Sequence, residues 1–172
     1  MIEADFGSGK AFDMELVYAY DGPTLLGTGG AIRHALPLLG EAFHVLYGDS
    51  YLPMDYAAAA EAWRTSGQPG LMTVFRNAGS GEPSNVEFAD GRIVRYDKAN
   101  PSPAMQHIDY GLSVFHREVF ASLPEGESID LATVQRGLAD TGRLAAYEVT
   151  QRYHEIGSPE GLAELDRFLT PL

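Results

Sequence analysis

The stretch Phe43-His44-Val45-Leu46-Tyr47-Gly48-Asp49 indicates the fold class, because an almost continuous apolar run ends in a glycine and a carboxylate. Such runs are typical of strands that are covered on both faces of a sheet. Leu71–Phe75 has the same character, and we predict strands at Glu15–Tyr20, Phe43–Tyr47, Leu71–Arg76, Arg92–Tyr96, Tyr110–Phe115 and Ala145–Val149. Helical patterns alternate with these strands, so the order predicts a layered α/β fold.

Helices are predicted where a capping residue precedes apolar side chains at helical spacing. Their expected starts are Thr28, Pro53, Asp130 and Ser158. The stretch Val86–Asp97 is predicted to form a β-hairpin, since Asp90-Gly91 at its centre tolerates the positive φ of a tight turn.

The composition limits the function. The 172 residues are 45% hydrophobic and 21% charged, which is ordinary for one globular domain. The net charge is −12 and the only lysines are Lys10 and Lys98, so neither nucleic acid nor a membrane surface is an expected partner. No apolar run approaches the roughly 20 residues of a membrane-spanning helix, and there is no cysteine or secretory leader, so we expect a cytoplasmic protein.

Three glycines within four residues mark the segment Leu26–Ile32. Glycines at the start of a helix leave backbone N–H groups exposed and let a flat or anionic ligand approach the main chain. The same glycines can serve turn geometry alone, and the residues do not decide between the two interpretations.

Two carboxylates are predicted to meet at one edge of the sheet. Asp49 follows a strand at the carboxyl end, where open α/β sheets bind ligands, although it could instead cap the next helix. Glu155 comes just before the helix that starts at Ser158. Two converging carboxylates make an oxygen-only site suited to magnesium. Lys98 either supplies a point charge suited to binding phosphate or is an ordinary surface lysine.

Taken in order, six motifs resemble those of a known family. They are Leu26–Ile32 (LGTGGAI), Tyr47–Asp49 (YGD), Asn85–Glu87, Asp97-Lys98, Tyr110–Leu112 and Glu155–Pro159 (EIGSP). The set resembles the sugar-1-phosphate nucleotidyltransferases, or nucleotide-sugar pyrophosphorylases, and is most similar to their mannose- or heptose-1-phosphate guanylyltransferase-like branch. The resemblance implies a three-layer α/β fold, nucleotide-diphospho-sugar transferase-like, with a mixed, mostly parallel sheet and helices on both faces.

The resemblance also implies a reaction, in which a nucleoside triphosphate and a sugar 1-phosphate give a nucleotide-sugar and pyrophosphate. Carried over by position, the implied metal ligands for Mg²⁺ are Asp49 and Glu155, and the implied contact to the sugar phosphate is Lys98. The implied contacts to base and ribose are Gly27, Thr28 and Gly30. The implied contacts to the sugar are Asn85, Asp97 and Gly111.

One family feature has no counterpart here, namely an initial strand followed by a glycine-rich loop with an arginine and a proline-flanked lysine. We therefore expect residues 1–172 to form a single N-terminally truncated domain, shorter by very roughly sixty residues if each βα unit takes about thirty. The strands at Glu15–Tyr20 and Phe43–Tyr47 would then present exposed apolar edges. Such a chain is expected to be a weakly active or inactive enzyme, and the alternative is a non-catalytic nucleotide-sugar binding or regulatory module.

Overall fold

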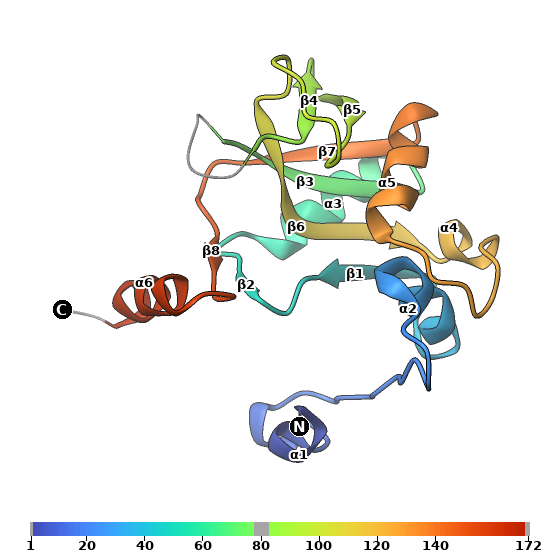
Figure 1. Ribbon diagram of the computed structural model, residues 1–172, viewed down its shortest axis with the longest axis vertical. Helices are drawn as coiled ribbons and strands as arrows, with labels where there is room; N and C mark the ends of the chain where they lie inside the picture. The colour runs from blue at the N-terminus through green and yellow to red at the C-terminus, as the bar shows by residue number, and fades with distance from the viewer. Residues whose placement is uncertain (1, 78–82, 171–172) are drawn as a thin grey trace.

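A six-stranded sheet forms the body of the molecule in the computed structural model, which describes residues 2–77 and 83–170 (Figure 1). The spatial order of the strands is β1-β6-β3-β7-β5-β4. Their bounds are β1 Ala42–Leu46, β3 Gly70–Arg76, β4 Val86–Ala89, β5 Arg92–Tyr96, β6 His107–His116 and β7 Leu144–Val149. Five of the six predicted strands are thereby confirmed, with ends that differ by up to three residues.

The sheet is mixed, as predicted, because β6 runs antiparallel to both of its neighbours, β1 and β3. Strands β3 and β7 form the parallel ladder, from Gly70 opposite Leu144 to Phe75 opposite Val149. The remaining ladders are antiparallel, so antiparallel pairing predominates over the expected mostly parallel arrangement. The predicted hairpin is confirmed as β4 and β5, with Asp90 and Gly91 both at positive φ in the turn.

Helices cover both faces of the sheet, which confirms the three layers (Figure 1). Side chains of β6 alternate between the two sides, as the period of a strand requires. Phe115 packs in one core with Leu138 of α5 (Leu131–Asp140), whereas Leu112 packs in the other with Ala59 of α3 (Tyr56–Ser66).

Side-chain caps fix where three of the helices begin. The cap predicted at Thr28 is wrong, because α2 (Gly27–Ala35) already begins at Gly27 and has no side-chain cap. Asp130 and Ser158 accept hydrogen bonds from N–H groups in the first turns of α5 and α6 (Pro159–Leu169), as predicted. The prediction that a helix starts at Pro53 is wrong, because Asp55 accepts from the N–H groups of both Ala57 and Ala58 and starts α3 at Tyr56.

A separate two-stranded sheet joins two distant parts of the chain. It pairs β2 (Ser50–Tyr51) with β8 (His154–Glu155) in antiparallel register, with Ser50 opposite Glu155. Figure 1 shows this pair beside the end of β1, with α6 extending away from the main sheet. The pair brings together the two segments that follow β1 and β7.

The N-terminal part lies apart from the main sheet in Figure 1. It contains α1 (Ile2–Phe6), the 3-10 helix η1 (Lys10–Phe12) and a segment without regular structure up to Leu26. The strand predicted at Glu15–Tyr20 is therefore wrong, because no described strand lies beside it. Its tyrosines instead bind α1 and the residue that follows it: Tyr20 donates to the side chain of Glu3, and Tyr18 donates to the carbonyl of Gly7.

The next elements pack at one end of the main sheet. They are α2 (Gly27–Ala35), the 3-10 helix η2 (Leu36–Leu38) and α4 (Glu118–Ala121). Strand β1 also departs from prediction, since it is an edge strand whose residues are half-buried or exposed rather than covered on both faces. No helix in the described part of the chain is long and apolar enough to cross a membrane.

Candidate functional site

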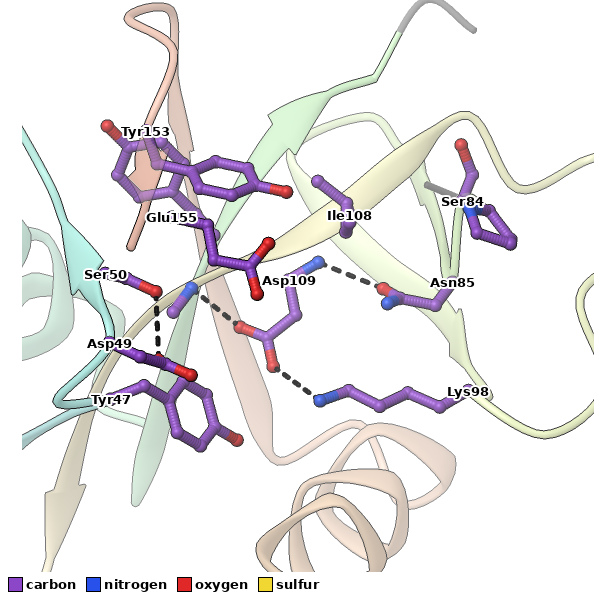
Figure 2. A pocket seen from close by; sticks show the side chains of 13 residues that line it. Tyr47, Asp49, Ser50, Ser84, Asn85, Lys98, Ile108, Asp109, Tyr153 and Glu155 are labelled. Carbon is purple, nitrogen blue, oxygen red and sulfur yellow. Dashed lines mark hydrogen bonds and ion pairs between the residues drawn. The ribbon is translucent and has the colours of Figure 1, made fainter. Parts of the chain in front are cut away.

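A pocket of about 400 Å³ opens where the ends of β1, β6 and β8 meet (Figure 2). Five of the residues expected to form a site line it, namely Asp49, Asn85, Lys98, Gly111 and Glu155. Its other lining residues are Tyr47, Ser50, Pro83, Ser84, Ile108, Asp109, Tyr110 and Tyr153. The topology therefore brings residues more than 100 positions apart into one cavity.

The β2–β8 pair places Asp49 and Glu155 beside each other. The N–H of Ile156 donates to the carbonyl of Asp49 at 2.8 Å, directly next to the Ser50–Glu155 pair. A Cβ atom built on Gly157 would lie 3.3 Å from Glu155 Oε1 and 4.0 Å from Asp49 Oδ2. Both carboxylates thus face the same small space, which Gly157 leaves open.

This space suits a hard divalent cation such as Mg²⁺, which takes oxygen ligands and keeps several waters. Among the described residues, neither Asp49 nor Glu155 has an ion pair with a basic side chain. Asp49 Oδ1 accepts a hydrogen bond from the hydroxyl of Ser50 at 3.3 Å, and each carboxylate can still offer an oxygen as a ligand. No group of three or more acidic or histidine side chains in the described ranges could hold a metal alone. The remaining ligands would therefore come from water and from the phosphates of a bound substrate.

Lys98 reaches the opposite side of the pocket, where its ammonium lies 3.9 Å from Asp109 Oδ2 (Figure 2). Asp109 is a residue that the sequence analysis missed. Its carboxylate also accepts hydrogen bonds from the N–H of Gly111 at 3.1 Å and from the hydroxyl of Tyr96 at 3.2 Å. Burial raises the pKa of Asp109, and the positive charge of Lys98 opposes that rise.

Asn85 and Gly111 belong to the same cluster of hydrogen bonds. The N–H of Asp109 donates to Asn85 Oδ1 at 3.0 Å, which fixes the amide of Asn85 at the pocket edge. Gly111 has φ +102, a conformation that favours glycine. A Cβ there would lie 3.6 Å from the ring of Tyr47, so the absent side chain also keeps the pocket wall open.

Asp97 lies outside this pocket and lines a smaller one, of about 180 Å³, beside α5. Its carboxylate accepts from the N–H groups of Ala99 and Asn100, each at 3.0 Å, and lies 3.2 Å from Arg95. These contacts, led by the N–H of Asn100, lower the pKa of Asp97. In this structure its side chain organises the loop that carries Lys98.

Gly27, Thr28 and Gly30 form the first turn of α2, and none of them lines the pocket. The turn packs closely on the segment before α5, since the N–H of Gly30 donates to the carbonyl of Ile129 at 3.1 Å. A Cβ on Gly30 would lie 2.4 Å from the carbonyl oxygen of Glu127. Close packing therefore accounts for this glycine. Thr28 accepts a hydrogen bond from the N–H of Leu131 at 2.9 Å.

The chain is similar to known proteins over nearly its whole length, although no family model matches it. It is 27% identical over 183 residues to a mannose-1-phosphate guanylyltransferase of Mycobacterium tuberculosis, covering 99% of this chain and 50% of that protein. It is 26% identical over 162 residues to an N-acetylmuramate alpha-1-phosphate uridylyltransferase of Neisseria meningitidis, covering 91% of this chain and 68% of that protein. The chain thus spans half the length of the first relative and about two thirds of the second.

A solved structure supports the fold. A crystal structure assigned as a glucose-1-phosphate thymidylyltransferase from Bacillus anthracis superposes with a TM-score of 0.82 at 14% identity, covering 99% of this chain and 72% of that one. The molecule therefore has the nucleotide-diphospho-sugar transferase fold, with its pocket at the ends of the strands. In sequence and in fold the chain is therefore similar to sugar-1-phosphate nucleotidyltransferases.

Proposed function

We propose that the pocket serves nucleotidyl transfer, in which a nucleoside triphosphate and a sugar 1-phosphate yield a nucleotide-sugar and pyrophosphate. The observation that carries this proposal is the convergence of Asp49, Glu155 and Lys98 on one cavity. Two carboxylates facing a cation space on one side and an ammonium on the other suit a doubly phosphorylated ligand between them. Phosphoryl-type transfer depends mainly on positioning and charge neutralisation, and these groups can supply both.

In this proposal the residues of the pocket have three roles: binding of metal, of phosphate and of sugar. Asp49 and Glu155 would hold Mg²⁺, which when bound neutralises charge on the phosphate oxygens. Lys98 would bind the phosphate of the sugar 1-phosphate and orient its attacking oxygen. Asn85 and Gly111 would face the sugar, with Asp97 shaping the loop beside them.

The nucleotide would lie toward the first turn of α2, which includes Gly27, Thr28 and Gly30. This is supported by the contact of Thr28 with Asp130, at 3.4 Å between Oγ1 and Oδ1. Asp130 lines the smaller neighbouring pocket together with Lys98, which also lines the main pocket, so the turn lies on the Lys98 side of the cavity.

The test is a pyrophosphate-release assay on the purified chain with four nucleoside triphosphates and a panel of sugar 1-phosphates. We expect weak turnover, in keeping with the weakly active enzyme expected from the sequence, that needs Mg²⁺ and falls at least about 100-fold further in Asp49→Asn, because a metal ligand loses its charge. Asp140→Asn, which removes an exposed carboxylate at the end of α5, is the matched control. Turnover that Asp49→Asn leaves unchanged would remove Asp49 from the site.

A non-catalytic nucleotide-sugar binding module is the second candidate. It is favoured by the edge strand β1, which in the described ranges pairs only with β6 and offers its other edge to another chain. Calorimetric titration with nucleotide-sugars separates the two functions. Magnesium-dependent binding without turnover by any substrate pair supports the module, whereas turnover supports the enzyme.

A further inference from the structure

Asp109 lines the pocket, but it has no part in the binding of metal, phosphate or sugar proposed above (Figure 2). Its side chain is only 3% exposed. Desolvating a carboxylate so completely costs considerable free energy unless hydrogen bonds and a cation compensate it. Packing alone therefore does not explain a carboxylate at this position in the sheet, which points to a role in the site.

The partners of Asp109 come from three separate elements and from the pocket itself. Gly111 donates to Oδ1 from β6 and Tyr96 donates to Oδ2 from β5. From α5, Gln135 acts to lower the pKa of this carboxyl. The cation that faces it is Lys98, 3.9 Å from Oδ2. The donors on β5 and β6 hold the carboxylate in one position.

Lys98, by contrast, is a long side chain that is 45% exposed and would be mobile without fixed contacts. Its ammonium lies 5.5 Å from the ring centre of Tyr47 and 6.0 Å from that of Tyr96, within the range of cation–π attraction. Its distance from Asp109 exceeds that of a hydrogen bond, so the attraction is electrostatic and leaves N–H donors for a ligand. The two rings and the carboxylate together direct the ammonium.

We propose that Asp109 is a positioning residue for this site, whose fixed, buried carboxylate holds the ammonium of Lys98 where it meets the phosphate of the substrate. This inference rests on the proposed function, because it is the sugar phosphate that Lys98 would meet. Asp109 has its oxygens occupied and acts on the substrate through Lys98 rather than by contact.

The kinetic consequence is a change in kcat rather than in KM. Asp109→Asn keeps the shape of the side chain but removes its charge, so Lys98 still binds phosphate but is poorly placed. A misplacement of about 1 Å can cost about 100-fold in rate. We expect kcat to fall between tenfold and 100-fold in this variant, with KM for the sugar phosphate changed less than about threefold. Asp140→Asn is expected to leave both constants unchanged.

A spectroscopic test needs no turnover, because the chain contains only two lysines, Lys10 and Lys98. In the chain labelled with ¹³C-lysine, ring currents of Tyr47 and Tyr96 should displace the ε-methylene signal of Lys98 from that of exposed Lys10. Asp109→Asn should move the Lys98 signal toward the Lys10 position, whereas Asp140→Asn should not. A Lys98 signal that is unaltered in Asp109→Asn overturns the proposal.

A double-mutant cycle tests the pairing through the free energy of unfolding in urea. Asp109→Asn and Lys98→Met should each destabilise the chain, and the double variant should lose less than the sum, because it no longer buries an unpaired charge. Strictly additive losses overturn the proposal. If Asp109→Asn does not fold, Tyr96→Phe removes one donor to the carboxylate and should shift the Lys98 signal in the same direction; an unshifted signal counts against the proposal.

Different results would contradict the proposed function and the positioning role of Asp109. Absence of turnover and of nucleotide-sugar binding in the unmodified chain counts against the proposed function, while the lysine spectra and the unfolding cycle still decide the pairing. Turnover that persists in Asp109→Asn at the original kcat overturns the positioning role and leaves the proposed function standing.

Discussion

Gly157 is the residue that keeps the space between the two carboxylates open. An added Cβ would lie 3.3 Å from Glu155 Oε1 and 4.0 Å from Asp49 Oδ2, so it would occupy part of the space that both carboxylates face. We expect Gly157→Ala to weaken Mg²⁺ binding roughly tenfold, the size typical when groups next to metal ligands are disturbed. Calorimetric titration of the chain with Mg²⁺ measures it.

The matched control is Gly48→Ala, next to Asp49, where an added Cβ meets no other atom within 4 Å. It should bind Mg²⁺ as the unmodified chain does. Equal Mg²⁺ affinity in Gly157→Ala and Gly48→Ala would mean that the ion, if it binds, lies elsewhere.

Asp97 gives a prediction for the dependence of stability on pH. Its pKa is lowered in the folded chain, first by the N–H of Asn100, so the folded state prefers the ionised carboxylate. The stabilisation is therefore present above the unfolded value of about 3.9 and is lost as the pH falls through the folded pKa. Urea unfolding should show Asp97→Asn less stable than the unmodified chain at pH 7, with the difference shrinking at pH 3. A difference that is constant between the two pH values would contradict it.

Site residues could be predicted from the sequence only where a charged side chain lies at the end of a predicted strand or just before a predicted helix. Asp49 directly follows Gly48, Glu155 lies two positions before Gly157, and Lys98 is one of two lysines. Asp109 carries no such signal, because it interrupts the apolar strand β6 and its partners lie on β5 and α5, which only the tertiary fold brings near. A carboxylate inside an apolar strand is itself the clue that could have found it.

At the scale of elements, we predict opposite changes in the free energy of unfolding when two helical glycines are replaced by alanine. A Cβ on Gly30 in α2 would lie 2.4 Å from the backbone oxygen of Glu127, which cannot move without shifting its segment. Gly30→Ala should therefore destabilise the chain by about 1–3 kcal/mol. A Cβ on Gly137 in α5 meets no other atom within 4 Å, so Gly137→Ala should stabilise it by about 0.5–1 kcal/mol. Urea unfolding measures both.

If both substitutions shifted the free energy of unfolding in the same direction, close packing of α2 against the segment before α5 would not explain Gly30. A loss of nucleotide affinity in Gly30→Ala, at unchanged stability, would instead favour direct ligand contact by this turn.

Most elements could be predicted because local patterns and caps agree with the fold. Strands β3 and β7 and the helices after Asp130 and Ser158 all begin within a residue of prediction. The strand predicted at Glu15–Tyr20 failed for a physical reason: an apolar, β-rich pattern forms a strand only beside a partner, and none of the described strands lies there. Sequence shows propensity, whereas pairing depends on neighbours.

The whole molecule has its helices on both faces of one sheet but leaves one edge of that sheet without a partner (Figure 1). Within the described ranges β1 pairs only with β6, and Leu46 at its end is 47% exposed. Exposed apolar edge strands promote pairing between chains unless charge or a covering element prevents it. The free edge of β1 is therefore a surface where a second copy of the chain could pair.

We predict that the chain self-associates through this edge and that Leu46→Lys shifts it toward the monomer. A lysine on an edge strand would bring like charges together in an edge-to-edge pair. Val94→Lys is the matched control, because Val94 is 53% exposed on β5, which is paired on both sides. Sedimentation velocity over a concentration series should show association reduced by Leu46→Lys alone. Equal reduction by both substitutions would point to general charge repulsion rather than to the β1 edge, and a monomer at every concentration would show that the edge does not pair.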